Sequence, residues 1–240
     1  MKKLRLILLL FLSLCLLNPT DAAYAKGKQS PVPDTVADHH SKLTALYKTA
    51  SGRYCTAILI SSTAALTAKH CGGPQPAKRS GTIYPGANGN KRPFGYMNIS
   101  TYTPHPNSKY DIAILKGTER DQDESYKYYI GKFTTTVKGY TDEEFRKIIG
   151  QEVYSYGYPQ GKKFHNQMQY RSDGQITNYK TKPIPYLLTD LPAFSGQSGS
   201  GVFKKDSEFL GIMVTRTRGN TGNVLPFTES IAEWINENAK

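Results

Sequence analysis

The sequence predicts an all-β protein, a sandwich or a barrel, with a single helix at its C-terminal end. Short runs of β-branched and aromatic residues alternate with turn signals along most of the chain. Only the segment 228–238 carries apolar residues at helical spacing. The length of 240 residues suits one large compact domain or two small ones that share an interface.

The predicted strands form two sets, separated by a polar, turn-rich connection at 117–146. The first set begins after Leu43 and includes 54–60, 64–68, 81–84, 96–102 and 112–115, and the second includes 153–156, 175–179, 186–189, 201–203 and 209–215. The terminal helix is indicated by Ile231, Trp234 and Ile235, with Thr228 or Ser230 able to cap it.

Residues 1–25 are expected to be a cleaved export signal. Three basic residues precede an apolar run, Leu6 to Leu17, that is short for a bilayer span. Ala23-Tyr24-Ala25 then places small residues at the two positions that a signal peptidase reads, which predicts cleavage before Lys26. The mature protein is therefore expected to be secreted, either outside the cell or into a periplasm, with no stable membrane insertion. Residues 26–40, rich in Lys, Ser, Pro and Asp, are expected to be a flexible leader or a short propeptide.

The chain is basic, with a formal net charge of +12. Loss of the signal removes three basic residues and one acidic residue and leaves +10. The Lys and Arg residues are dispersed and form no long basic run, which argues against a nucleic-acid partner and favours a role in solubility and surface adhesion. We expect a monomer that needs no cofactor and no metal.

The first candidate site residue is His70, which follows a β-type run and is followed by Cys71. Cys55 lies sixteen positions before Cys71, and in an exported protein two such cysteines most simply form a disulfide. That disulfide would stabilise the fold by about 3 kcal/mol and would hold the turn that carries His70. The alternatives are a structural histidine beside a disulfide, or zinc held by Cys55, His70 and Cys71. The zinc site would lack a fourth ligand.

The second candidate is Asp111, which opens the apolar run Ile112 to Leu115. A buried carboxylate needs a partner, and an imidazole N–H is a suitable one because the carboxylate then fixes its tautomer. Taken alone, Asp111 is better interpreted as a turn residue that caps the strand, and only the other two candidates reverse that preference.

The third candidate is Ser198, inside the run Ser195-Gly196-Gln197-Ser198-Gly199-Ser200-Gly201. Glycines around a central serine allow a sharp turn, so that the hydroxyl projects while the N–H groups of Gly196 and Ser198 converge into an oxyanion hole. Gly/Ser repetition also occurs in flexible loops. Val202 and Phe203 follow directly and indicate a structured turn before a buried strand.

Thr-Ala-x-His-Cys, Asp-Ile-Ala and Gly-x-Ser-Gly-Ser, in this order, resemble the marks of chymotrypsin-fold serine proteases. The closer resemblance is to the bacterial glutamyl endopeptidase group, which includes the staphylococcal V8 protease, the exfoliative toxins and their bacillus relatives. It rests on Gly157-Tyr158-Pro159, Gly174-Gln175-Ile176, Asp190 and Glu208 to Ile212, and the Cys55–Cys71 pair is similar to the bacillus branch.

The resemblance covers residues 45–238 and implies two six-stranded antiparallel β-barrels with the active site between them and a C-terminal α-helix. The first barrel would span 41–130 and carry His70 and Asp111. The second would span 131–240 and carry Ser198. The implied function is a secreted serine endopeptidase that acts on proteins or peptides through a Ser-His-Asp triad.

Glutamate specificity does not transfer from the resemblance. The Thr and His with which the family binds the substrate carboxylate are replaced here by Ala193 and Met213, and Pro192 stands where trypsin-like members carry Asp. An apolar pocket of Ala193 and Met213 favours a neutral side chain. Arg216 and Arg218 follow the expected substrate-binding strand, Met213 to Thr215, where they would narrow the pocket, attract an acidic residue or simply face solvent.

The competing functions are a catalytically silent protein of this fold that binds a host or cell-wall partner, and a wall-adherent esterase. His39, His40, His105 and His165 are expected to have no catalytic role.

If His70 is the general base, the hydrolysis rate should fall as the pH drops through the pKa of a free imidazole, about 6.5. The measurement is kcat/KM across about pH 5 to 8. A flat profile would argue against His70 as the base.

Overall fold

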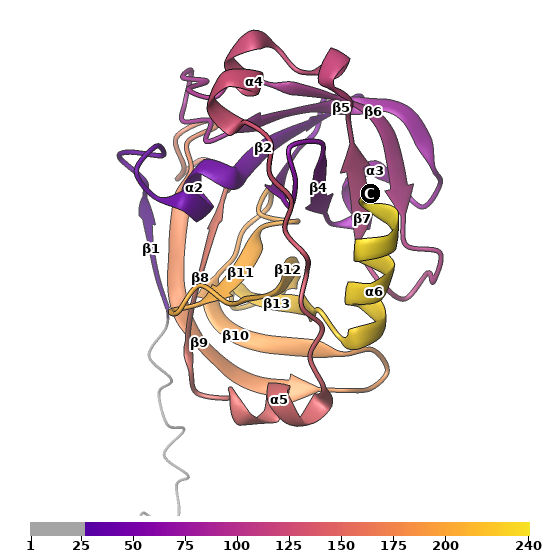
Figure 1. Cartoon of the computed structure of the whole chain (residues 1–240). Coiled ribbons are helices and arrows are strands. Elements are labelled where there is room, and N and C mark those ends of the chain that lie inside the picture. The colour runs from indigo at the N-terminus through magenta and orange to yellow at the C-terminus, as the bar shows by residue number, and fades with distance from the viewer. Residues whose placement is uncertain (1–26) are drawn as a thin grey trace, which may run out of the picture.

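The computed structural model describes residues 27–240, and its strands form two closed antiparallel β-barrels stacked on one another (Figure 1). The predicted export signal, 1–25, lies outside the described residues. Each barrel has six strands, and one helix ends the chain, so the predicted fold class is confirmed. Of the two architectures that the residue pattern allowed, the barrel is the one formed.

The first barrel closes in the order β2-β3-β4-β7-β6-β5. Its strands are β2 (Thr44–Thr49), β3 (Tyr54–Leu59), β4 (Ala64–Thr67), β5 (Ala77–Pro85), β6 (Met97–Pro104) and β7 (Ala113–Lys116). Large aliphatic side chains fill its interior, among them the fully buried Leu66, Ile83 and Ile114. Closure pairs every strand on both edges, so no strand of this ring has an open edge.

The second barrel closes in the order β8-β9-β10-β13-β12-β11. Its strands are β8 (Glu152–Gly157), β9 (Tyr170–Lys180), β10 (Tyr186–Pro192), β11 (Gly201–Lys204), β12 (Phe209–Arg216) and β13 (Thr221–Pro226). Sequence patterning missed β13, whose Gly222 and Asn223 weaken the strand signal. It forms because it pairs with β10 on one side and β12 on the other.

The segment expected to be a flexible leader or a short propeptide, 26–40, is described from residue 27 onward, and there it contains regular structure. Strand β1 (Lys28–Pro31) pairs antiparallel with β9, and helix α2 (His39–Leu43) follows, capped by the Asp38 carboxylate. His40 stacks on Phe203 with 3.8 Å between ring centroids, and its Nδ1 lies 2.8 Å from the Tyr154 hydroxyl. Backbone pairing and aromatic packing make this segment part of the fold.

The connection between the barrels carries three short helices rather than turns alone. They are η1 (Glu119–Asp121), α4 (Glu124–Ile130) and α5 (Asp142–Lys147). Side-chain caps begin two of them: Asp123 accepts from the Tyr126 N–H, and Thr141 accepts from the Glu144 N–H. Such short helices bury few residues, which explains why apolar periodicity did not reveal them.

Helix α6 (Glu229–Asn238) leaves the second barrel and packs back along the first, beside β7 (Figure 1). Ile231 and Ile235 are fully buried, and the Trp234 ring lies 4.5 Å from the His105 ring. Thr228 is the N-cap residue, as expected, but its hydroxyl makes no capping hydrogen bond. Helix α6 therefore links the second barrel to the first.

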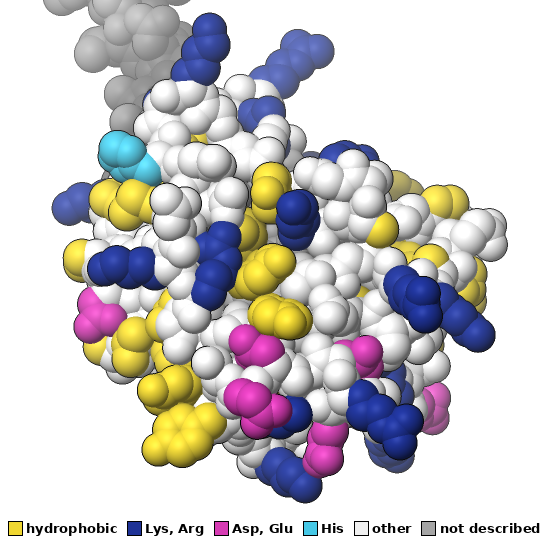
Figure 2. Space-filling view, turned by 90° about the horizontal axis from the view of Figure 1, so that it is seen from above, with side chains coloured by type: hydrophobic (Ala, Val, Ile, Leu, Met, Phe, Trp, Pro, Cys, Tyr) yellow, Lys and Arg dark blue, Asp and Glu magenta, His cyan; other side chains and the backbone are white. Residues whose placement is uncertain are grey.

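Lys and Arg side chains are spread over the face seen from above, with hydrophobic side chains between them (Figure 2). Among residues 27–240, the most exposed large hydrophobic residue is Tyr128 in α4, at 81%. Within residues 27–240, no helix is long and apolar enough to cross a membrane.

Candidate active site

His70 lies in a four-residue helix, α3 (Lys69–Gly72), at the end of β4. The Tyr102 hydroxyl, from β6, lies 2.7 Å from the carbonyl oxygens of both Lys69 and Gly73 and fastens the two ends of this helix. The predicted disulfide joins Cys71 to Cys55 in β3. Three contacts from neighbouring strands therefore fix a helix too short to be stable alone.

Lys69 connects the His70 helix to the loop that leads to Asp111. Its side chain is largely buried, and the amine donates to the carbonyls of His105 (3.2 Å) and Asn107 (2.8 Å). Burial lowers the pKa of the Lys69 amine, and the nearby Asp111 charge opposes that shift. Lys69 was not among the residues predicted for the site. A lysine between an apolar strand and a histidine was the available signal.

The three residues predicted to act together form one hydrogen-bonded chain. The Asp111 Oδ2 lies 2.7 Å from the His70 Nδ1, and the Asp111 Oδ1 accepts from the His70 backbone N–H at 2.9 Å. The His70 Nε2 lies 2.8 Å from the Ser198 Oγ. The His70 side chain is 49% exposed and Asp111 22%, so the imidazole is open to a ligand while its carboxylate partner is more shielded.

The turn that carries Ser198 is held by the first barrel, mainly through Thr56 in β3. The Thr56 N–H donates to the Ser198 carbonyl at 3.0 Å, and its hydroxyl donates to the Gly196 carbonyl at 2.8 Å. That hydroxyl also accepts from the Tyr158 N–H at 3.1 Å. The residue therefore binds two carbonyls of the turn and a backbone N–H beside it. Sequence reasoning missed Thr56, since nothing local marks a contact 140 residues away.

The Ser195–Gly196 peptide has a defined orientation. Its carbonyl accepts from the Gln160 N–H at 2.7 Å, and the peptide is trans, so the Gly196 N–H points away from Gln160. Gly196 has φ +90°, a conformation that favours glycine. Within the described chain, no hydrogen bond engages the N–H of Gly196 or of Ser198. Both donors are thus free for a ligand.

A hollow of about 190 Å³ lies beside Ser198. All four predicted pocket residues line it: Ala193, Met213, Thr215 and Arg216. The lining also includes Phe194, Ser195, Ser198 and Val214. Strand β12 runs one residue further than expected, because Arg216 still pairs with Gly222 of β13. The Arg216 guanidinium donates to the Asn220 side-chain oxygen, which restrains it near the hollow. Arg216 is the only charged residue in the lining.

The remaining histidines lie apart from this chain of hydrogen bonds. His40 and His105 pack against aromatic rings, and burial lowers the pKa of both imidazoles. Within residues 27–240, no group of three or more His, Cys, Asp or Glu side chains is arranged to hold a metal ion. The groups that the fold brings together at the site are a hydroxyl, an imidazole, a carboxylate and two backbone donors.

Residues 55–212 match the family model of the trypsin-like peptidase domain. No curated protein matches the chain. Among solved structures, a Glu endopeptidase is similar at 22% identity and a TM-score of 0.71, covering 90% of this chain and 98% of its own. The protease Anisep from Arthrobacter nicotinovorans is similar at 15% identity and a TM-score of 0.65, and the match covers 88% of this chain and 99% of that protein. A scabies mite inactivated protease paralogue is similar at 18% identity and a TM-score of 0.62, and the match covers 82% of this chain and 94% of that protein. These likenesses show the fold.

The contacts of Thr56 lead to a prediction about the reactivity of Ser198. Thr56→Val keeps the side-chain shape and removes the hydroxyl that binds Gly196, so the turn loses one anchor. We expect the rate at which a fluorophosphonate modifies Ser198 to fall about tenfold, equivalent to about 1.4 kcal/mol. Thr101→Val, at an exposed position of β6, is the matched control and should react at the wild-type rate. Equal rates for both variants would mean that Thr56 does not position the turn.

Proposed function

Because this chain belongs to the trypsin-like peptidase domain family, we propose that it is a secreted serine endopeptidase that hydrolyses peptide bonds through a covalent acyl-enzyme. The observation that carries the proposal is the hydrogen-bonded chain from Ser198 through His70 to Asp111. Family membership alone supports a peptidase. A connected hydroxyl, imidazole and carboxylate beside two free N–H donors supports a working one.

In the proposed mechanism, the His70 Nε2 takes the proton of the Ser198 hydroxyl as the Oγ attacks the carbonyl carbon of the substrate. The oxygen of that carbonyl becomes negatively charged and is stabilised by the N–H groups of Gly196 and Ser198. His70 then gives its proton to the leaving nitrogen as the C–N bond breaks. A water molecule, deprotonated by His70, attacks the acyl-enzyme, and His70 returns that proton to the Ser198 Oγ as the C–Oγ bond breaks and the carboxylic acid leaves.

Asp111 holds the imidazole in the tautomer that leaves Nε2 free to accept a proton. Its Oδ1 is held by the His70 backbone N–H, and its Oδ2 bonds the ring Nδ1, so the ring cannot turn without losing the Nδ1 contact. The carboxylate also stabilises the positive imidazolium that forms during the reaction. Asp111 is thus assigned the role of orienting and electrostatic partner.

The proposed specificity is for a neutral side chain before the cleaved bond. The hollow is small, its walls include Ala193 and Met213, and the Met213 side chain lies against Gly222. A substrate carboxylate buried there would need a cationic partner. The one cation in the lining, Arg216, is solvent-exposed, and one of its N–H groups donates to Asn220.

Covalent labelling by a fluorophosphonate tests the proposed function. The mature protein should gain the mass of one probe per chain, because the Ser198 hydroxyl is activated by His70. Ser198→Ala should gain none, and Asp111→Asn should react more slowly by roughly 10³- to 10⁴-fold. Absence of labelling in a folded, correctly processed protein would contradict the enzymatic role and favour a binding protein of the same fold.

Cleavage of a peptide library tests the specificity. We expect neutral residues before the cleaved bond to be preferred over both Glu and Lys by at least about tenfold, because a buried unpaired charge is unfavourable. The double variant Ala193→Thr, Met213→His adds a hydroxyl and an imidazole to the walls and should raise cleavage after Glu. A wild-type preference for Glu would contradict this account of the pocket and would assign Arg216 the role of carboxylate partner.

A further inference from the structure

The N-terminal strand β1 reaches the turn that carries Ser198 through one side chain, that of Gln29. The Gln29 Nε2 donates to the Ser172 Oγ at 2.9 Å and to the Gln197 Oε1 at 3.2 Å. Gln29 lies directly opposite Ser172 in the β1–β9 pairing. The side chain therefore spans from the first strand of the described chain to the residue that immediately precedes Ser198.

Gln197 and Ser172 are both fully buried, and each holds the backbone of the loop that precedes Ser198. The Gln197 Oε1 accepts from the Phe194 N–H at 2.9 Å, and the Ser172 Oγ donates to the Pro192 carbonyl at 2.8 Å. Gln29 contacts both holding groups at once. Its amide thus supports the loop at its start, through Ser172, and near its end, through Gln197.

We propose that Gln29 is a positioning residue, and that docking of β1 sets the loop that forms the oxyanion hole and one wall of the substrate pocket. The inference rests on the proposed function of Ser198. Phe194 lines the pocket and the Gly196 N–H is one of the two free donors, so the loop that Gln29 supports contributes to both. The support is neutral, because Gln29, Ser172, Gln197 and the Phe194 N–H carry no ionisable group.

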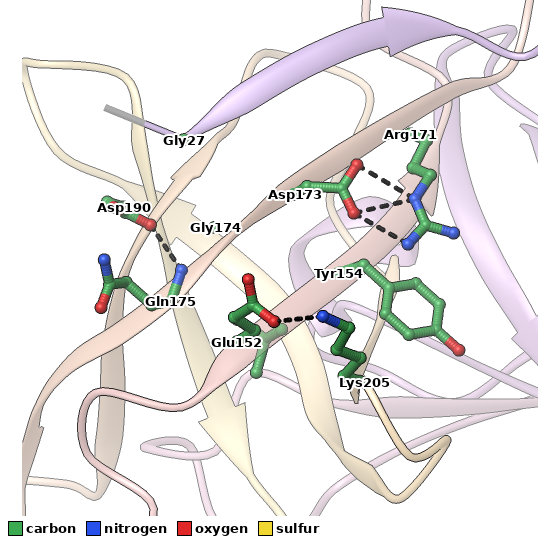
Figure 3. A pocket seen from close by; sticks show the side chains of 10 residues that line it. Gly27, Glu152, Tyr154, Arg171, Asp173, Gly174, Gln175, Asp190 and Lys205 are labelled. Atoms are coloured by element: carbon green, nitrogen blue, oxygen red, sulfur yellow. Dashed lines mark hydrogen bonds and ion pairs between the residues drawn. The ribbon is translucent and has the colours of Figure 1, made fainter. Parts of the chain in front are cut away.

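The backbone at the start of β1 shows how closely this strand is seated. The Gly27 N–H donates to the Asp190 carbonyl at 3.1 Å. A Cβ on Gly27 would lie 2.5 Å from the carbonyl oxygens of both Asp173 and Asp190, so only glycine allows this approach. Gly27 and Asp190 both line a hollow of about 470 Å³ on the second barrel. Figure 3 shows the two residues there, with the Asp190 carboxylate accepting a hydrogen bond from the Gln175 N–H.

The test compares Gln29→Ala with Lys28→Ala, a neighbour in β1 whose side chain is exposed. Two quantities are measured: kcat and KM on a cleaved peptide, and the hydrogen-exchange rate of the backbone amides in the segment 193–199. Gln29→Ala should lower kcat about tenfold with KM within about twofold, and should speed exchange of the 193–199 amides, because the loop loses its support. Lys28→Ala should match the wild type in both.

A second variant separates the strand from the side chain. Gly27→Ala should displace β1 and reproduce the kcat loss with Gln29 intact. In addition, Gln29→Ala should lower kcat by a smaller factor in a Gln197→Ala background than in the wild type, since the contact with Gln197 is then already lost and only the contact with Ser172 remains. Gln29→Ala should lower kcat by the same factor at neutral pH and at about pH 9, as no group in the contact titrates between these values.

The outcomes distinguish this inference from the proposed function. Unchanged kcat and unchanged exchange in Gln29→Ala would overturn the inference, even if the melting temperature falls, because Gln29 would then serve the stability of β1 alone. Faster exchange at 193–199 in Gln29→Ala, in a protein whose wild type neither cleaves peptides nor takes up a fluorophosphonate, would uphold the coupling and refute the proposed function.

Discussion

Two adjacent residues of β3 hold both sides of the contact between Ser198 and His70. Cys55 is joined by the disulfide to Cys71, which follows His70 in α3. Thr56 binds the carbonyls of Gly196 and Ser198 in the opposite barrel. A single strand therefore sets the 2.8 Å distance between the imidazole and the hydroxyl. Proximity of this kind is worth several kcal/mol of a reaction barrier only when the geometry is kept, so the barrel interface is where the site depends on the fold.

The loop before Ser198 is held from three directions, and each support is a neutral hydrogen bond. Gln160 binds the Ser195 carbonyl, Thr56 binds the Gly196 carbonyl, and Gln197 binds the Phe194 N–H. These contacts leave the N–H groups of Gly196 and Ser198 unoccupied, which is the arrangement an oxyanion requires. Buried amides and hydroxyls need hydrogen-bond partners. The hydrogen bonds that pair the polar groups of this loop therefore also restrain its conformation.

The sequence predicted the parts of this protein that have local signatures. Short β-type runs between turn signals predicted ten of the strands, and short motifs pointed to His70, Asp111 and Ser198 as candidate site residues before their distances were known. Strand β13 escaped detection because pairing with two neighbours outweighs its weak propensity. Short helices such as α4 escaped because they depend on caps rather than on a long apolar face.

The supporting residues could not have been predicted from local patterns. Thr56 contacts a residue 140 positions away, and Gln29 contacts one 168 positions away. A glutamine in a polar leader and a threonine in an apolar strand are ordinary in both places. Only the fold places them beside the Ser198 turn. The segment expected to be flexible is thereby the one that the structure ties to the residue preceding the proposed nucleophile.

The most direct test of this account is a crystal structure of the mature protein after reaction with a fluorophosphonate. Its phosphonyl oxygen stands in for the oxyanion of the transition state. The account predicts a bond from phosphorus to the Ser198 Oγ, with that oxygen within about 3.1 Å of the N–H groups of both Gly196 and Ser198. A Ser195–Gly196 peptide turned so that its carbonyl faces the phosphonyl oxygen, or an adduct on another residue, would contradict it.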